Sequence, residues 1–202
     1  MMAGHGKGGK GTAQGPVPVG QVRIVGGRWR NTRLAVPDSP GLRPSGDRVR
    51  ETLFNWLTGQ LAGARVLDLF AGTGALGLEA LSRGAASATL VERDTALARA
   101  MNDTVVRLGA QAEAVVVQGD ALSWLAGQAH GAFDVVFVDP PFAAGLWEAV
   151  LAALLPKVAA GGWIYVESPA DQAPTPGPGW SLHRQGQTRE VRYALYRGPE
   201  RR

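Results

Sequence analysis

Cysteine is absent from the 202 residues of this chain. Disulfide bonds, thiolate metal sites and mechanisms with a cysteine nucleophile are therefore excluded. Histidine is scarce, and His5, His130 and His183 lie far apart without the spacing of metal ligands, so we expect no metal site. No apolar run approaches the roughly 20 residues of a membrane span, and the first residues lack the apolar core of a signal peptide. These absences predict a cytoplasmic protein with no membrane partner.

Hydrophobic residues make up 45% of the chain, enough for one ordinary core. We therefore expect one main domain, at residues 61–202, with a small extension before it at residues 21–60. Residues 1–20 consist mostly of glycine, proline and small polar residues, which offer too little apolar surface to offset the entropy of ordering. The sequence predicts a disordered tail there. A monomer is the default expectation.

Positive charge is concentrated near the start of the chain. Between residues 23 and 50 seven arginines face only two aspartates, a local net charge of +5 that exceeds the +4 of the whole chain. Such a concentration forms one patch of positive potential, suited to a phosphate backbone, although a solvated charged face is the alternative interpretation. The arginines are Arg23, Arg28, Arg30, Arg33, Arg43, Arg48 and Arg50.

The same segment predicts a β-hairpin followed by a helix. Gly26 and Gly27 form a natural turn between partly alternating stretches, which would leave arginines on the exposed face. Asp47 is placed to cap a helix over residues 48–57, in which one face carries the apolar side chains of Val49, Leu53, Trp56 and Leu57.

From residue 65 onward, short apolar runs alternate with helical segments. This alternation is typical of a mostly parallel sheet with helices on both faces. The expected strands are 65–69, 87–92, 114–118, 134–138 and 162–167, and the expected helices are 75–83, 95–108, 121–128 and 145–159. Residues 180–197 predict two more strands, joined near Gly186 as an antiparallel hairpin. The proline-rich residues 169–179 indicate a surface loop.

A glycine-rich turn follows the first of these strands and leads into a helix. Gly72 and Gly74 allow a tight turn and a close approach of the backbone to a ligand, and the helix offers free N–H groups. Such a turn is common to dinucleotide sites and plain strand-to-helix connections. Asp68 argues against a dinucleotide, because a carboxylate repels phosphates but attracts the ammonium group of an aminoacyl ligand.

Acidic residues also end the next two strands. Glu92 can accept hydrogen bonds from both hydroxyls of a ribose, and Asp120 can accept from an adenine amino group. Each alone is more often a helix cap or a solvent contact. Three acidic residues at successive strand ends, including Asp68, indicate a nucleoside site, because ligands bind outside the carboxyl ends of such sheets.

The fourth strand ends in Asp139, Pro140, Pro141 and Phe142. Consecutive prolines hold neighbouring carbonyl groups in fixed directions. The carboxylate of Asp139 and the carbonyl of Pro140 can accept the hydrogens of a base amino group and aim its lone pair, and positioning of this kind removes about 7–11 kcal/mol from a barrier. Phe142 can stack on an unstacked base, worth about 1–3 kcal/mol. Methylation at pyrimidine C5 usually needs a cysteine, whereas amino-group methylation does not.

Five motifs together resemble the RsmD family of 16S rRNA (guanine-N2) methyltransferases, within the class I methyltransferase superfamily. The resemblance covers about residues 22–197. The glycine loop and DPPF occur in many amino methyltransferases, whereas the two arginine-rich motifs are specific to the family. The motifs are RIVGGRWR (23–30), RPSGDRVRETLFNWL (43–57), DLFAGTGALGLEALSRGA (68–85), VERD (91–94) and DPPF (139–142).

The resemblance implies a Rossmann-like sheet of seven strands, S-adenosylmethionine as methyl donor, and a guanine of 16S rRNA in the assembled 30S subunit as target. It places Asp139, Pro140, Pro141 and Phe142 at the target base. Around the cofactor it places Asp68, Phe70, Ala71, Gly72, Thr73, Gly74, Glu92, Arg93, Asp120 and Ala121. The residues expected to face RNA or shape the site are Arg23, Arg28, Arg30, Arg48, Arg50 and Glu51. Ser45 and Gly46 depart from the family, which commonly has threonine and another polar residue there.

Three alternatives remain open. A DNA adenine-N6 or cytosine-N4 methyltransferase would use the same DPPF motif, but it usually carries a separate target-recognition region for which this chain has no room. A nicotinamide-dependent oxidoreductase would have no use for DPPF or Asp68. A noncatalytic RNA-binding protein on this scaffold would not need the full set of pocket residues.

Overall fold

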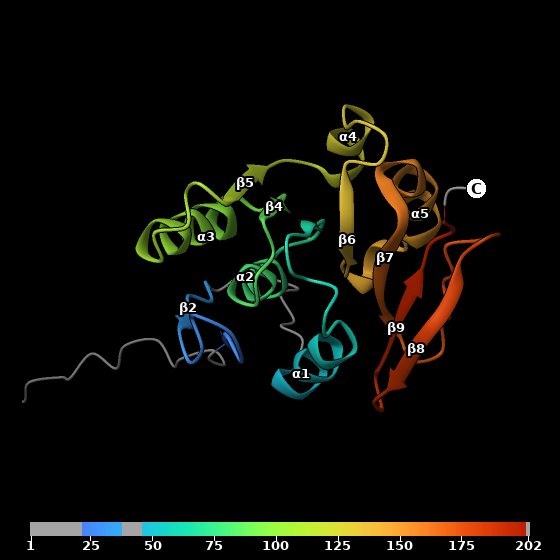
Figure 1. Ribbon diagram of the computed structural model, residues 1–202, viewed down its shortest axis with the longest axis horizontal. Coiled ribbons are helices and arrows are strands. Elements are labelled where there is room, and N and C mark those ends of the chain that lie inside the picture. Colours follow the sequence, from blue (N-terminus) through green and yellow to red (C-terminus); the bar gives the residue numbers. More distant parts are fainter. Residues whose placement is uncertain (1–21, 38–45, 201–202) are drawn as a thin grey trace, which may run out of the picture.

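The structure, a computed structural model, describes residues 22–37 and 46–200 (Figure 1). The expected tail at 1–20 and the Arg43–Ser45 part of the second arginine motif lie outside the described residues. The main domain alternates strands and helices as the apolar pattern predicts. Its elements are β3 (Arg65–Asp68), α2 (Ala75–Ser82), β4 (Ser87–Glu92), α3 (Thr95–Arg107), β5 (Ala114–Gln118), α4 (Ala121–Ala126), β6 (Phe133–Val138), α5 (Trp147–Leu154), β7 (Val158–Pro169), β8 (Ser181–Gln187) and β9 (Val191–Arg197).

The seven strands of the main domain form one sheet in the order β5-β4-β3-β6-β7-β9-β8. The five strands from β5 to β7 are parallel, and β9 and β8 complete the sheet in antiparallel fashion. The chain moves outward from β3 to β5 and then returns to place β6 on the other side of β3. In open α/β sheets, ligands bind outside the carboxyl ends of the strands where the strand order reverses, which in this sheet is between β3 and β6.

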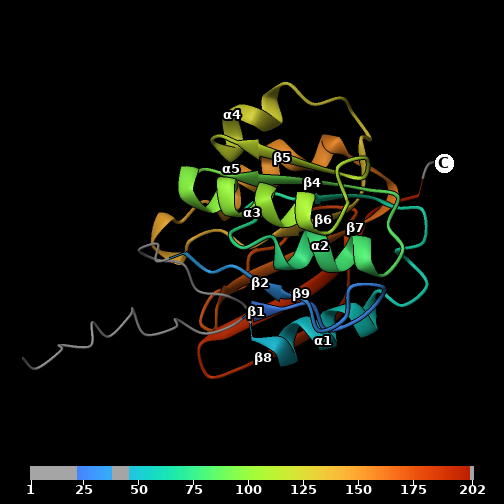
Figure 2. The same ribbon diagram turned by 90° about the vertical axis from the view of Figure 1, so that its left-hand side faces the viewer.

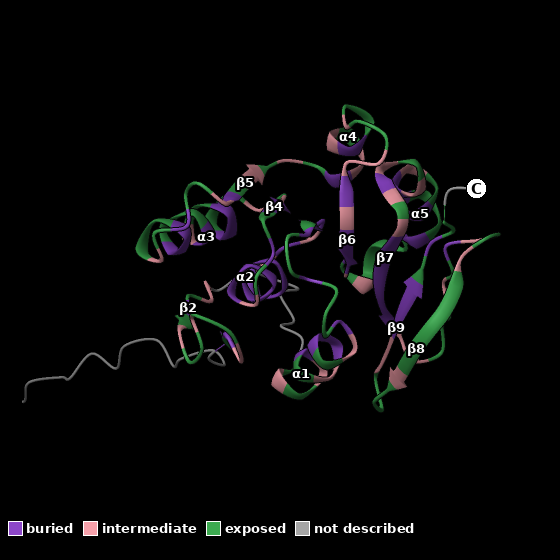
Figure 3. Cartoon of the chain, in the orientation of Figure 1, coloured by how far each residue is buried: buried purple, intermediate pink, exposed green. Residues whose placement is uncertain are grey.

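Helices cover both faces of the sheet (Figure 2), and the strands and the inward sides of the helices are largely buried (Figure 3). The buried residues form two apolar clusters. The first cluster joins α1 (Asp47–Trp56), α2 and α3 to one face, with Leu53, Leu78 and Met101 buried among its members. The second cluster joins α4 and α5 to the opposite face, with Leu125 and Leu154 fully buried. Because parallel strands are covered on both faces, their residues are apolar almost throughout.

An N-terminal hairpin precedes the sheet, followed by helix α1 (Asp47–Trp56). The hairpin, residues 22–34, pairs β1 (Val22–Arg23) with β2 (Arg33–Leu34) through a long turn that contains Gly26 and Gly27. The predicted hairpin is therefore confirmed. Helix α1 starts at Asp47 itself, with Gly46 as N-cap and no side-chain cap bond, so the expected capping role of Asp47 was wrong. The Asp47 carboxylate instead accepts hydrogen bonds from Arg23 and Arg50.

Two other expectations were also wrong in detail. The helix expected at 145–159 ends at Leu154, because Pro156 lacks an N–H and the chain tightens into a short 3₁₀ turn before β7. The turn expected near Gly186 lies at residues 188–190, whereas Gly186 is within β8 opposite Tyr193. A Cβ at Gly186 would lie 2.3 Å from the Tyr193 ring, so this glycine permits close packing of a ring and does not form the turn.

Candidate cofactor and active site

The glycine loop, residues 69–74, connects β3 to α2 at the carboxyl edge of the sheet. Gly72 and Gly74 have φ values of +57° and +80°, which residues with a Cβ rarely adopt. A Cβ on Gly74 would also lie 2.9 Å from the sulfur of Met101, so the loop packs closely on α3. The tight turn predicted at these glycines is therefore confirmed, and a close approach of the backbone to a ligand stays a prediction. Ala71 and Thr73 are buried within it, and Phe70 is half-buried.

Asp68 ends β3 beneath this loop and is 2% exposed. Its Oδ2 accepts a hydrogen bond from the N–H of Gly77 in the first turn of α2, at 2.9 Å. Burial raises the pKa of Asp68 to about 7, with a further rise from the negative charge of Glu92 and an opposing effect of the Gly77 bond. A cation beside this buried carboxyl group would stabilise its ionised form, and the predicted ammonium partner stays a prediction.

Glu92 ends β4 next to the glycine loop and is half-buried. Its Oε2 accepts from the N–H of Gly72 at 2.8 Å, and its Oε1 accepts from the N–H of Asp94 at 2.7 Å. Each carboxylate oxygen has a second lone pair for a ribose hydroxyl. In the structure Glu92 therefore holds the loop in place, a role that the sequence pattern did not reveal, and its ribose contact stays a prediction.

Asp120 follows β5 and is exposed at the same edge. Its Oδ1 accepts from the backbone N–H and the hydroxyl of Ser123, at 2.9 and 3.0 Å, and so caps α4. These bonds hold the pKa of Asp120 below its ordinary value. The adenine contact stays a prediction, as do contacts from exposed Arg93 and buried Ala121. The structure brings the ends of β3, β4 and β5 together through parallel pairing.

The DPPF segment follows β6, the neighbour of β3 on the other side. In the parallel ladder Asp68 pairs with Phe137, so Asp139 begins two residues beyond the end of that pairing, about 7 Å along the strand direction. Pro140 is buried and Pro141 is exposed at the start of a 3₁₀ turn, η1 (Phe142–Ala144). Phe142 is half-buried, with its ring centroid 5.8 Å from that of Trp147. The motif thus lies beside the glycine loop.

Polar residues that were not predicted from the sequence lie on β7, beside Asp139, and on β9, the strand after it. Continuing the β6–β7 register by one residue pairs Asp139 with Glu167, which is paired in turn with Tyr193. The hydroxyl of buried Tyr165 donates to Oε2 of Glu167 at 3.0 Å. Burial raises the pKa of Tyr165 well above its ordinary value, and the charges of Glu167 and Asp139 raise it further. The Tyr193 ring stacks on Trp56 of α1 at 5.4 Å. The sequence does contain a signal for these polar residues, since Tyr165 and Glu167 alternate with Val166 at the end of an otherwise apolar strand.

The predicted RNA-facing arginines divide into exposed and buried positions. Arg30 and Arg48 are exposed. Arg28 is exposed, pairs with Glu113, and lies with its guanidinium carbon 4.0 Å from the centroid of the Trp29 ring. Arg23 is exposed and donates to Oδ2 of Asp47 at 3.2 Å. These four positions form an accessible cationic surface on the hairpin and α1.

The prediction that Arg50 faces RNA was wrong, because its side chain is only 1% exposed. Its Nη1 donates to the carbonyl of Arg23 at 2.7 Å and to Oε2 of Glu79 at 3.2 Å, while Nη2 donates to Asp47 at 2.5 Å. Glu79 is fully buried in α2, where it needs cationic and N–H partners. Arg50 therefore joins the hairpin, α1 and α2 from within and is not available to a phosphate.

Residues 22–37 and 46–200 contain neither a membrane-spanning helix nor a cluster of metal ligands. No helix in these ranges is long and apolar enough to cross a bilayer. In the same ranges, no cluster of three or more histidine, aspartate or glutamate side chains could hold a metal ion.

The strand order, the glycine loop above a buried Asp68 and the DPPF segment beside it define a class I S-adenosylmethionine-dependent methyltransferase. The family described as Conserved hypothetical protein 95 matches residues 22–197, and the chain belongs to this family. This match, together with the relatives below, confirms the resemblance to the RsmD family.

Named relatives cover most of the chain. Ribosomal RNA small subunit methyltransferase D of Escherichia coli (strain K12) is 50% identical over 186 residues, 88% of this chain and 90% of the relative. The protein of the same name from Haemophilus influenzae is 41% identical over 189 residues, 91% of this chain and 97% of the relative. The solved structure of the candidate methyltransferase yhhF from Escherichia coli is 46% identical with a TM-score of 0.82, covering 90% of this chain and all of that chain.

Proposed function

We propose that this protein transfers a methyl group from S-adenosylmethionine to the exocyclic N2 of a specific guanine in 16S ribosomal RNA, within the assembled 30S subunit. Relatives at 50% and 41% identity are named as methyltransferases of small-subunit ribosomal RNA. The observation that carries the proposal is the parallel pairing of β3 with β6, which puts the cofactor loop and Asp139 side by side at one sheet edge.

The residues at the edge fit the methyl donor. Buried Asp68 supplies a carboxyl group for the ammonium of the methionine part, and the glycine loop leaves room for the backbone to contact it. Glu92 and Asp120 are placed for the ribose and the adenine, with Phe70, Ala71, Thr73, Arg93 and Ala121 around them. When bound, S-adenosylmethionine supplies an electrophilic methyl group on its sulfonium.

The chain's own residues prepare the acceptor. Asp139 and the carbonyl of Pro140 accept the hydrogens of the amino group and orient its lone pair, and Phe142 supports the ring of the unstacked base. Residues 21–60 supply the RNA-facing part through Arg23, Arg28, Arg30 and Arg48, and residues 61–202 form the methyltransferase domain. The protein acts as a monomer in the cytoplasm, where its substrate is.

Methyl transfer to 30S subunits from cells that lack the gene tests this proposal. Wild-type protein should form N2-methylguanine, identified by mass spectrometry of the RNA nucleosides, and Asp139→Asn should lower turnover at least about 100-fold because the amine loses its charged acceptor. Affinity for S-adenosylhomocysteine, measured by calorimetry, should stay within about twofold in the variant. Naked 16S RNA and duplex DNA serve as parallel substrates.

Three results would contradict the proposal. N6-methyladenine or N4-methylcytosine formed in the DNA would return the assignment to the DNA alternative. Binding of NAD in place of S-adenosylhomocysteine would indicate an oxidoreductase. Unchanged turnover of Asp139→Asn would remove the role given to the carboxylate while leaving the substrate assignment standing.

A further inference from the structure

Arg23 and Arg33 are direct partners across the two-residue ladder of the N-terminal hairpin. The neighbouring pair, Val22 and Leu34, is 4% and 5% exposed and faces the core, so the arginine pair lies on the outer face. Like charges directly opposite on adjacent strands destabilise the pairing. A bound anion between them would remove this repulsion, which makes the pair a candidate anion site.

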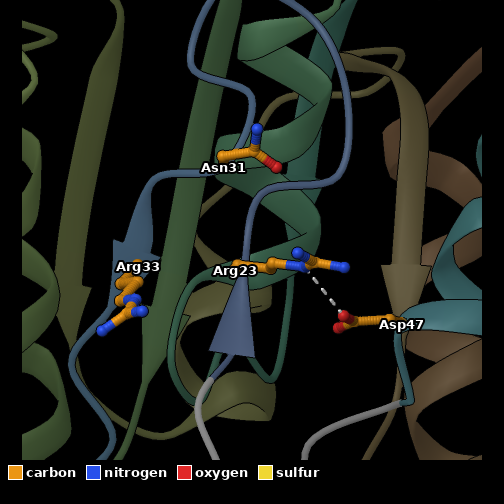
Figure 4. Close-up of a pocket in the computed structure, with 4 residues that line it drawn as sticks. All are labelled: Arg23, Asn31, Arg33 and Asp47. Atoms are coloured by element: carbon orange, nitrogen blue, oxygen red, sulfur yellow. Dashed lines mark hydrogen bonds and ion pairs between the residues drawn. The ribbon is translucent and has the colours of Figure 1, made fainter.

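The space beside this pair is hollow. Arg23, Asn31, Arg33 and Asp47 line a hollow of about 390 Å³, which we call the cationic hollow (Figure 4). Figure 4 shows the Arg23 side chain extended toward Asp47 and the Arg33 side chain turned away from Arg23. Asn31 adds an amide from a backbone position with φ of +68°, a conformation that asparagine tolerates better than most residues. Two guanidinium groups and an amide offer several donors to one anion.

Side chains of α2 hold the backbone of the turn that connects β1 and β2. Glu79 accepts hydrogen bonds from the N–H groups of Val25 and Gly26, at 3.1 and 3.0 Å. The hydroxyl of Ser82 donates to the carbonyl of Gly26 at 2.6 Å and accepts from the N–H of Trp29 at 2.9 Å. Because the turn is tied to α2 on both sides, an anion would not need to order the hairpin in order to bind, which lowers the cost of binding.

Asp47 forms an ion pair with one of the two arginines, Arg23, in this structure. It accepts from Arg23 at 3.2 Å and from Arg50 at 2.5 Å. If Arg23 turned to an anion in the hollow, Asp47 would keep buried Arg50 as its partner. The Asp47 contact to Arg23 is exposed on both sides, with side chains 56% and 45% accessible, and exposed pairs of this kind are weak. Asp47 therefore competes with an anion for Arg23 and does not block it.

We propose that the cationic hollow binds a backbone phosphate of the RNA substrate, with Arg23 and Arg33 as its donors, Asn31 as a further donor and Asp47 as the competing carboxylate. A third cation supports the site, since Nη2 of exposed Arg107 on α3 donates to the carbonyl of Arg33 at 2.8 Å. The proposal rests on the proposed function for the identity of the RNA, and it adds a defined phosphate site and a residue, Arg33, to the RNA-facing set.

The test uses two substitutions that should change the affinity for 30S subunits in opposite directions. Arg33→Gln should weaken binding of the full-length protein to 30S subunits about fivefold near 0.1 M salt and should make the salt dependence shallower by about 0.7 to 1, as loss of one phosphate contact does. Asp47→Asn should tighten binding about two- to fivefold, because asparagine still accepts from Arg50 but no longer competes as a charge. Affinity for S-adenosylhomocysteine reports correct folding of each variant.

Matched controls separate the site from general charge. Arg197→Gln removes a cation that pairs with Glu200 at the amino edge of the sheet, and Glu148→Gln removes an anion on α5, on the opposite face. Neither should reproduce the effects of Arg33→Gln and Asp47→Asn. The proposal is overturned if Arg33→Gln matches Arg197→Gln in affinity and salt slope, or if Asp47→Asn fails to bind more tightly than Glu148→Gln.

Two further outcomes identify the source of failure. If nuclear magnetic resonance shows that inorganic phosphate binds at the hollow of the free protein while RNA affinity is insensitive to Arg33→Gln, the hollow is a site for a free anion and the proposed RNA contact is overturned. If wild-type protein methylates no ribosomal RNA, the proposed function fails. If it does and the variants behave as their controls, the phosphate site alone fails.

Discussion

Nη1 of Arg50 donates a hydrogen bond to Oε2 of Glu79 at 3.2 Å, and the two side chains are 1% and 0% exposed. The same carboxylate accepts from Nε and Nη2 of Arg83 and from two backbone N–H groups of the hairpin. Glu79 lies on α2, whose first turn binds Asp68 and whose last residue, Ser82, binds the hairpin. One short helix therefore positions both the cofactor loop and the arginine-bearing hairpin.

Glu79→Ala should destabilise the fold strongly. Removing Glu79 takes one carboxylate from buried Arg50, which still pairs with Asp47, and leaves the N–H groups of Val25 and Gly26 without their acceptor. Removal of one partner of a buried ion pair typically costs about 3–5 kcal/mol. Urea unfolding followed by circular dichroism measures the loss, and Glu148→Ala on the exposed side of α5 is the control, expected within about 0.5 kcal/mol of wild type. Equal midpoints for the two variants would show that the buried pair contributes little to the free energy of unfolding.

Gly27→Ala should loosen the hairpin without affecting the cofactor site. Gly27 has a φ of +78°, and a Cβ there would lie 1.9 Å from the carbonyl oxygen of Ser82, so the turn must move off α2. Gly59→Ala is a matched control, because Gly59 has a φ of +81° with no atom within 4 Å of the added Cβ. Hydrogen exchange should quicken at residues 24–32 in Gly27→Ala alone, and similar exchange in both variants would mean that backbone strain, not the clash, governs the turn.

Asp68 should make both stability and cofactor affinity depend on pH. Its pKa is about 7 in the folded chain against an ordinary 3.8, so folding loses stability as pH rises from 4 to 7, where the unfolded chain ionises first. Asp68→Asn should remove this dependence and be the more stable protein at pH 7 without cofactor. Thermal unfolding at several pH values measures it, and parallel pH profiles for the two proteins would contradict the assignment.

Binding of the cofactor product gives a second readout of Asp68. An ammonium group favours the ionised carboxylate, so S-adenosylhomocysteine should release a proton from wild-type protein near pH 7 and bind more tightly at pH 8 than at pH 6. Calorimetry in buffers of different ionisation enthalpy counts the proton. Absence of proton release from wild-type protein, or an equal release from Asp68→Asn, would place the ammonium elsewhere.

Glu92→Ala should weaken S-adenosylhomocysteine binding about 10- to 100-fold. The change removes the proposed ribose contact together with the two bonds that hold Gly72 and Asp94, and bonds to a charged acceptor are worth about 1.5–3 kcal/mol each. Glu92→Gln keeps one neutral acceptor and should fall between wild type and Glu92→Ala. Calorimetry measures all three, and an affinity of Glu92→Ala within twofold of wild type would show that neither the ribose nor the loop depends on this carboxylate.

Arg50 and Gly186 were both misinterpreted because local sequence patterns carry no information about contacts between distant residues. Arg50 follows Arg48 in a cationic helix, and periodicity alone cannot separate a solvated arginine from one that meets a buried carboxylate. The requirement for a cation follows only once Glu79 is seen in a helix whose eight residues are all buried, where an ionised carboxylate needs a cationic partner. Gly186 was interpreted as a turn because glycine marks turns more often than it marks ring packing across strands.

The order of strands and helices, the glycine loop, the strand-end acids and DPPF were predictable from the sequence because each depends on residues adjacent in the chain. Periodicity of apolar side chains, the φ values open to glycine and the rigidity of consecutive prolines are local properties. Tertiary structure alone decided that Arg50 is internal, that Glu92 also holds the glycine loop, that Glu167 lies beside Asp139 with Tyr193 on the next strand, and that Arg23 opposes Arg33. Those relationships join residues distant in the chain, and only strand register and burial bring their charges within reach of one another.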